Sequence, residues 1–199
     1  MYRGNTQALA SLRGRRVLVA LSGGIACYKT CSVVSTLAQH GCEVHVAMTL
    51  GATKFVTPLT LEALSGRPVY ADIWDGADRS DPQHIKLAKS IEVAIVAPCS
   101  MDLLAKVVHG FTDDPVSLLL AAIDRSAQPV VLAPSMNDAM WNQPATQRNL
   151  EAAERDGFRV LAPGSGWQAC RTVGAGRLPE PDDLVEALAA AFAARLGAS

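Results

Sequence analysis

Short β-branched runs alternate with helical stretches along almost the whole chain, and this alternation limits the possible folds more than any other feature. The expected strands are residues 15–21, 42–48, 68–73, 93–98, 129–134 and 158–163. Helices are expected between them at 24–39, 58–65, 84–90, 101–109, 115–125 and 144–156, and a last helix follows PEPDD. Several strands are apolar throughout, which is typical of a parallel sheet covered on both faces. The order predicts an α/β fold, a doubly wound, Rossmann-like parallel sheet of about six strands.

Size and composition narrow the protein class. The chain has 199 residues, 49% of them hydrophobic, and a net charge of -1. This charge gives no general attraction to nucleic acid or anionic membranes, and no apolar run is long enough to span a bilayer. The N-terminus lacks the continuous apolar segment of a signal peptide. We therefore expect a cytoplasmic protein with a flexible leader at 1–14 and a single domain at 15–199.

The cysteine pattern argues against a metal site. The five cysteines form no CxxC pair, and no His/Cys cluster has zinc spacing. An odd number of cysteines in a cytoplasmic chain indicates free thiols. We expect four of them, Cys27, Cys31, Cys42 and Cys99, to be small core residues, whereas Cys170 lies in a glycine-rich segment.

Four polar or glycine-rich stretches follow predicted strands, where open α/β sheets bind ligands. They are LSGGIACYK, AMTLGATKF, APCSMDLL and APSMNDAMW. Gly23 and Gly24 either form an ordinary βα turn or bring backbone N–H groups to an anionic ligand. Thr49 and Thr53 add hydroxyl groups at the next strand exit, which suggests one phosphate held from two loops.

Three further residues have both a structural and a functional interpretation. Asn137, among the large apolar residues of PSMNDAMW, is either a helix cap or a ligand-binding amide. His84 is either a cap or surface residue, or a functional group in a local positive field that attracts an anionic substrate. The glycines of 164–181 predict a mobile loop. Within it, Cys170 is either an incidental surface thiol or, beside Arg171, a reactive one.

Together these stretches resemble the homo-oligomeric flavin-containing cysteine decarboxylases, from about Arg15 to Ala194. SGGIACYK is similar to the family's first flavin loop, HIKLA to its histidine motif, and APCS to its second flavin segment. PSMNDAMW matches the distinctive P-x-M-N-x-x-M-W signature. ACRTVGAGRLPEP resembles the substrate clamp, although Arg171 and Thr172 replace the usual Gly-Asp. Met101-Asp102 and Thr112-Asp113-Asp114 also depart from the family pattern.

The resemblance implies FMN as the cofactor, with its phosphate at the first two loops and its ring near the later ones. The implied cofactor contacts are Gly23, Gly24, Ile25, Thr49, Gly51, Thr53, Pro98, Cys99, Ser100 and Met136. The implied substrate contacts are Lys29, Lys89, Asn137, Met140, Ala169 and Arg177. His84 would be the acid/base in an oxidation, and Cys170 the proton donor in a final reduction. Asn137 would bind the substrate carboxylate, where a cation would stabilise the ground state and raise the barrier to CO2 loss.

Three functions are compatible with the resemblance. The first is FMN-dependent decarboxylation of 4'-phosphopantothenoylcysteine to 4'-phosphopantetheine in coenzyme A biosynthesis, through a thioaldehyde and an enethiolate. The second is peptidyl-cysteine decarboxylation to an enethiol, against which Cys170 argues because that product needs no reductive step. The third is a non-catalytic FMN-binding regulatory subunit, against which His84 and Asn137 argue. The family also implies a homo-oligomer, a trimer or a multiple of it, with the active site shared between subunits.

Overall fold

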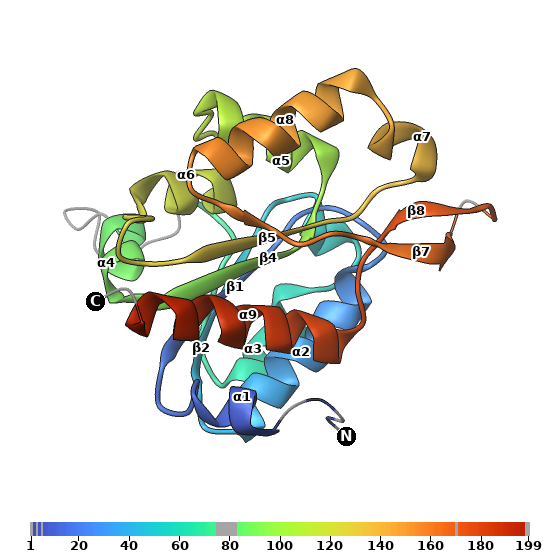
Figure 1. The fold of residues 1–199 in the computed structure, drawn as a ribbon. Coiled ribbons are helices and arrows are strands. Elements are labelled where there is room, and N and C mark those ends of the chain that lie inside the picture. Colours follow the sequence, from blue (N-terminus) through green and yellow to red (C-terminus); the bar gives the residue numbers. More distant parts are fainter. Residues whose placement is uncertain (1, 3, 5, 75–82, 170, 198–199) are drawn as a thin grey trace.

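A six-stranded parallel sheet in the order β3-β2-β1-β4-β5-β6 forms the centre of the molecule (Figure 1). The computed structural model describes residues 2, 4, 6–74, 83–169 and 171–197. The strands are β1 (Arg16–Leu21), β2 (Glu43–Met48), β3 (Val69–Tyr70), β4 (Val93–Cys99), β5 (Val130–Pro134) and β6 (Arg159–Val160). All five neighbouring pairs are parallel, so the predicted fold class is confirmed.

Helices cover both faces of the sheet (Figure 1). One face carries α1 (Thr6–Ala10), α2 (Cys27–Gln39), α3 (Pro58–Ser65) and α9 (Pro181–Leu196). The other carries α4 (Gln83–Ser90), α5 (Met101–His109), α6 (Pro115–Ala122) and α8 (Pro144–Arg155). Successive residues of β1 alternate between the faces: Val17 and Val19 enter one core, whereas Leu18 enters the other. In the part of the chain that the structure describes, no helix combines the length and apolar character needed to cross a membrane.

Two predicted strands are shorter than expected, and one helix starts later. After Tyr70 the Asp72 carboxylate accepts a hydrogen bond from the Trp74 backbone N–H at 2.8 Å, so the chain turns and β3 ends. β6 is likewise limited to two residues. The helix expected from residue 24 begins at Cys27, because the glycines form a turn closed by Cys27 N–H to the Gly24 carbonyl at 3.0 Å.

The predicted mobile loop at 164–181 is wrong. Strands β7 (Gly164–Trp167) and β8 (Val173–Arg177) form an antiparallel hairpin, which projects beyond the sheet beside α7 (Asp138–Trp141) (Figure 1). Glycines are generally unfavourable in strands, but here they permit close contact with the neighbouring loop. The hairpin therefore presents the clamp segment on an ordered element.

The segment expected to be a flexible leader contributes to the core instead. Residues 6–10 form α1, and the side chains of Leu9 and Leu12 are 1% and 0% exposed. Both lie in the cluster that also contains Phe192 of α9. Burial of two leucines stabilises the folded chain by roughly 3–6 kcal/mol, which is enough to hold a short segment in place.

Candidate active site

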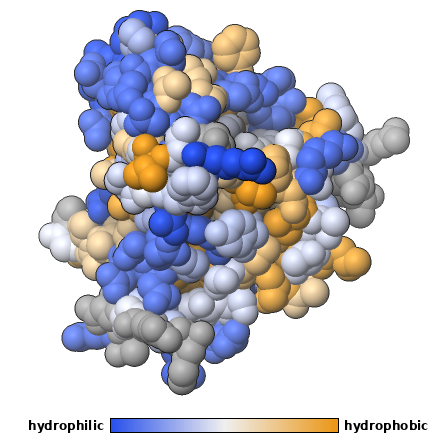
Figure 2. Space-filling model, turned by 90° about the vertical axis from the view of Figure 1, so that its right-hand side faces the viewer, coloured by the Kyte–Doolittle hydropathy of each residue, from blue (hydrophilic) through white to orange (hydrophobic). Residues whose placement is uncertain are grey.

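A cavity of about 650 Å³ lies at the carboxyl edge of the sheet, a size typical of small-molecule and cofactor sites. The loops that follow β1, β4 and β5 form its walls, and the β7–β8 hairpin completes them. β1 and β4 are neighbours in the sheet from which the chain winds in opposite directions, the position where such folds bind ligands. Figure 2 shows this side of the molecule, where apolar residues gather in the middle and right of the view.

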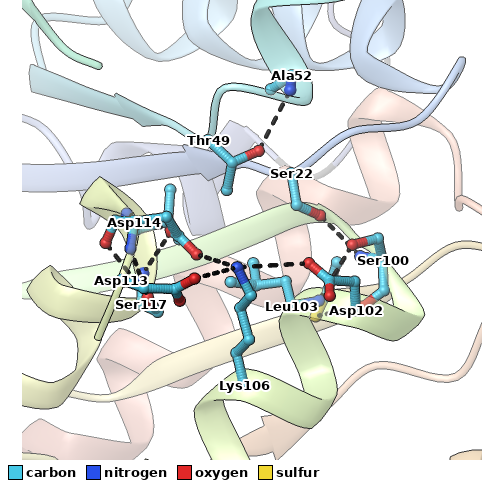
Figure 3. A network of polar contacts seen from close by, with 12 residues as sticks. Ser22, Thr49, Ala52, Ser100, Asp102, Leu103, Lys106, Asp113, Asp114 and Ser117 are labelled. Atoms are coloured by element: carbon cyan, nitrogen blue, oxygen red, sulfur yellow. Dashed lines mark hydrogen bonds and ion pairs between the residues drawn. The ribbon is translucent and has the colours of Figure 1, made fainter. Parts of the chain in front are cut away.

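The loops after β1 and β2 lie in direct contact. A Cβ atom at Gly23 would lie 3.0 Å from the Gly51 carbonyl carbon, so a side chain at this position would displace the neighbouring backbone. Ser22 fixes the other side of the same loop: its Oγ donates to the Pro98 carbonyl at 2.8 Å and accepts from the Ser100 N–H at 2.7 Å (Figure 3). The glycine loop is therefore narrow, rigid and close to a helix N-terminus, which suits an anionic group of a cofactor.

Asn137 is both a helix cap and a cavity residue. Its Oδ1 accepts a hydrogen bond from the Met140 N–H at 2.8 Å and so starts α7. Only the amide oxygen can accept this bond, which fixes the orientation of the amide group. Its Nδ2 makes no hydrogen bond within the described residues, and the side chain lines the cavity. The cap thus leaves an N–H donor for a ligand, and the two interpretations of Asn137 are compatible.

The β7–β8 hairpin packs closely against the loop that carries Asn137. The Met136 N–H donates to the Gly176 carbonyl at 2.9 Å, and the Asp138 carboxylate accepts from the Ala175 N–H at 3.1 Å. Gly176 has a φ of 103°, and a Cβ there would lie 2.3 Å from the Met136 carbonyl oxygen. A glycine is required here both by the backbone conformation and by this close approach.

Lys29 lines the cavity, but its ammonium group is already paired. It is 6% exposed and donates to the Leu178 carbonyl at 3.0 Å and to Glu180 at 2.9 Å. Arg177 donates to the same carboxylate oxygen at 2.6 Å. The hydrogen bond from Lys29 is the largest influence that lowers the pKa of Glu180 from its ordinary value. Lys29 therefore ties α2 to the segment between β8 and α9.

Ten of the predicted site residues line this cavity, and others lie close behind it. The ten are Gly23, Gly24, Ile25, Lys29, Ser100, Met136, Asn137, Met140, Ala169 and Arg177. Gly51 contacts Gly23, and Pro98 lies 3.6 Å from the position of a Cβ at Gly24. Cys99 is 0% exposed, and burial raises the pKa of its thiol to about 12, so it is a core residue that does not line the cavity.

The two predicted threonines have hydrogen-bond partners within their own loop. Thr49 Oγ1 accepts from the Ala52 N–H at 3.2 Å (Figure 3) and thereby starts the 3-10 turn η1 (Ala52–Lys54). Thr53 Oγ1 donates to the Leu50 carbonyl at 2.8 Å. Neither side chain lines the cavity, so in one chain they shape the second loop.

His84 and Lys89 lie on α4 and do not line the cavity. In Figure 1, α4 and the β7–β8 hairpin lie at opposite sides of the molecule. A single chain therefore does not bring His84 to Asn137. Cys170 lies outside the described residues, although its neighbour Ala169 lines the cavity.

Several cavity residues were not predicted. They are Ala26, Tyr28, Met101, Ser135, Trp167, Gln168, Gly176 and Leu178. Tyr28 and Trp167 are large and exposed at 62% and 65%. Six of these residues lie within the quoted motifs, and Trp167 and Gln168 directly precede the clamp motif. The motifs were therefore the available signal, but the packing of the hairpin against the Asn137 loop was not predictable from spacing.

Comparison with known proteins identifies curated relatives. The chain is 41% identical over 177 residues to the coenzyme A biosynthesis bifunctional protein CoaBC of Vibrio cholerae, and 41% identical over 182 residues to that of Escherichia coli K12. These alignments cover 89% and 92% of the chain, but only 44% of each relative. The chain thus spans less than half the length of the curated relatives it matches.

Solved structures share the fold. A PPC decarboxylase mutant complexed with pantothenoylaminoethenethiol superposes with a TM-score of 0.79 and 28% identity, covering 88% of this chain and 96% of that one. The FMN binding protein AtHal3 gives a TM-score of 0.75 and 28% identity, covering 93% and 97%. The model of the flavoprotein family matches residues 5–193. The chain therefore belongs to the flavoprotein family, as its loop motifs and its P-x-M-N-x-x-M-W signature predicted.

Proposed function

We propose that this protein decarboxylates 4'-phosphopantothenoylcysteine to 4'-phosphopantetheine in coenzyme A biosynthesis, with FMN as its cofactor. The carrying observation is Asn137, whose amide oxygen is held by the Met140 N–H while its nitrogen remains available at the cavity wall. The similarity to CoaBC proteins and to a PPC decarboxylase structure supports this substrate. With a role in coenzyme A biosynthesis, the protein would act in the cytoplasm as a single flavoprotein domain, to whose core α1 also contributes.

The cavity suits FMN. Gly23, where a side chain would displace the Gly51 backbone, and Gly24 lie in the loop that leads into α2, so its backbone N–H groups would hold the phosphate. Ile25, Ser100 and Met136 would contact the ring system. Thr49, Gly51 and Thr53 would support the phosphate loop through their contacts within the neighbouring turn. Pro98 and the buried Cys99 would lie behind the residues that contact the ring system.

The reaction assigns different steps to different residues. A bound flavin supplies a reversible two-electron acceptor, which permits oxidation of the substrate CH2–SH carbon and its later reduction. Asn137 Nδ2 would donate to the substrate carboxylate and orient it until CO2 leaves. His84 would take the thiol proton during oxidation, and Cys170 would donate a proton to carbon in the last step. Lys89, Met140, Ala169 and Arg177 would contact the rest of the substrate.

The separation of His84 from the cavity supports a shared active site. We infer a homotrimer, or a multiple of it, in which one chain supplies the cavity and a neighbouring chain supplies α4. Ile25 and Tyr28 at the cavity are exposed at 57% and 62%, and an apolar rim of this kind favours cover by a partner. Lys29 would then support the cavity wall, while Lys89 would approach the substrate from the other chain.

Mass spectrometry of the substrate after incubation with the purified protein tests the proposal. Loss of CO2 alone is the expected result. Loss of CO2 together with two hydrogens would identify an enethiol-forming decarboxylase instead, and an unchanged substrate would favour a non-catalytic FMN-binding protein. The purified protein should be yellow, and a colourless protein that takes up no added FMN would contradict the cofactor assignment.

A further inference from the structure

The side chain of Gln168 joins the hairpin to the loop that carries Asn137. Gln168 is 8% exposed and lines the cavity. Its Oε1 accepts from the Asp138 N–H at 3.2 Å, whereas its Nε2 donates to the Ala175 carbonyl at 2.5 Å and lies 3.5 Å from the Met136 carbonyl. A single amide, on the residue that follows β7, therefore contacts β8 and the peptide groups on each side of Asn137.

The surrounding contacts make this connection rigid. Met136 N–H to the Gly176 carbonyl and Ala175 N–H to the Asp138 carboxylate hold β8 along the same three residues. A carboxamide can both accept and donate through separate atoms that are fixed in one plane. An apolar side chain of similar length at 168 would leave the Asp138 N–H and the Ala175 carbonyl without these partners.

We propose that Gln168 is a positioning residue that couples the clamp to Asn137, so that decarboxylation and the final reduction take place in one closed site. This inference rests on the proposed function. Asn137 orients the carboxylate that leaves first, and Cys170, two residues beyond Gln168 in the sequence, protonates the product last. If the hairpin separates from the Asn137 loop between these steps, the enethiol is released before it is reduced.

The balance of the reaction makes this release measurable. Complete turnover converts one substrate into CO2 and the saturated thiol, and the electrons taken from the CH2–SH carbon return to the product. When the enethiol leaves, CO2 is still formed, but those two electrons stay on the cofactor until dissolved dioxygen removes them as hydrogen peroxide. Without dioxygen, each such site stops after a single turnover.

The test compares Gln168→Met with Gln128→Met. Gln128 is a matched control, because its Nε2 also bridges two backbone carbonyls, those of Ala88 and Ile91, but outside the cavity. Both variants should lose some thermal stability. Only Gln168→Met should raise the ratio of enethiol to saturated thiol, by about tenfold, which corresponds to about 1.4 kcal/mol. Mass spectrometry of the products and the stoichiometry of hydrogen peroxide measure this ratio.

A second measurement does not depend on turnover. Amide hydrogen exchange of the peptide that contains Asp138 should accelerate in Gln168→Met and remain unchanged in Gln128→Met, because only the first loses the acceptor of the Asp138 N–H. A product ratio and an exchange rate equal to those of the wild type would overturn the role of Gln168. Failure of the wild-type protein to release CO2 would instead contradict the proposed function, and the exchange measurement would still decide whether Gln168 holds the loop.

Discussion

At the scale of single residues, Asn137 combines two roles, helix cap and cavity residue, that the sequence left as alternatives. Its oxygen caps α7, and its nitrogen keeps no hydrogen bond within the described residues, while the residue lines the cavity. The sequence predicted both roles because the amide stands at the end of a buried strand. It did not predict the equivalent importance of Gln168, because a glutamine in a glycine-rich segment has no pattern that distinguishes it from a surface residue.

Asn137→Asp should separate stability from activity. Aspartate caps helices as well as asparagine, so the free energy of unfolding should change by less than about 1 kcal/mol. The added negative charge would face the substrate carboxylate, and such repulsion costs several kcal/mol at a low effective dielectric. CO2 release should therefore fall by about a thousandfold or more. Thermal unfolding and CO2 detection measure the two effects.

Asn142→Asp is the matched control for this charge. Asn142 ends α7, its Nδ2 donates to the Asp138 carbonyl at 3.0 Å, and it does not line the cavity. The control adds the same charge five positions away and should retain most of the activity. If Asn137→Asp and Asn142→Asp release CO2 at similar rates, Asn137 does not bind the carboxylate.

At the scale of elements, the sequence predicted those with a strong hydrophobic period and missed those that depend on contacts. Strands β1, β2, β4 and β5 lie where buried runs were found. The β7–β8 hairpin has no such run, since its glycines are there for close contact with Met136 and Asp138. Arg171 near its tip has a φ of 66°, a left-handed conformation that favours glycine, which is the residue that the family motif has at this position.

Gly176→Ala should loosen the hairpin. The new Cβ would meet the Met136 carbonyl oxygen, and φ at this position is unfavourable for alanine. Together these effects should lower the free energy of unfolding by about 2 kcal/mol or more. Gly164→Ala is the control in the same hairpin, because its Cβ would lie at an ordinary 3.6 Å from the Arg177 carbonyl. Urea denaturation compares the stabilities of the two variants. Equal stabilities would show that β8 does not need the close contact between Gly176 and the Met136 carbonyl.

The tie between α2 and the start of α9 should depend on pH. The hydrogen bond from Lys29 lowers the folded-state pKa of Glu180 below its ordinary value of 4.5. The contribution of the ionised Glu180 carboxylate to folding stability is therefore fully present above pH 4.5. It is lost as the pH falls through the lower, folded-state pKa. Wild type should exceed Glu180→Gln in stability at pH 7, and the difference should shrink toward pH 3.

Urea denaturation across this pH range provides the measurement. Glu154→Gln is the control, since Glu154 lies on the exposed side of α8 and forms no ion pair among the described residues. A stability difference between wild type and Glu180→Gln that stays constant with pH would mean that the Lys29–Glu180 pair adds nothing to folding.

At the scale of the whole molecule, the sequence predicted a doubly wound parallel sheet with ligand-binding stretches at the carboxyl ends of its strands, but not which residues one chain can bring together. The parallel, doubly wound arrangement follows from alternating elements and right-handed crossovers, and the structure adds the strand order β3-β2-β1-β4-β5-β6. The position of α4 depends on the course of the chain after β3, and no sequence motif predicts that course. His84 and Asn137 therefore belong to one predicted site and yet lie apart in the folded chain.

Mixing two inactive variants tests whether neighbouring chains join these residues. His84→Asn and Asn137→Asp each remove one of the two residues from every site of their own assembly. If a site takes Asn137 from one chain and His84 from the next, random mixing of equal amounts should restore about one quarter of the sites. Sites built within single chains would regain nothing, because each chain would keep its own defect. The measurement is CO2 release from the two variants after they are refolded together. The control is the same two variants refolded separately and then combined. Equal inactivity in both samples would contradict the shared site.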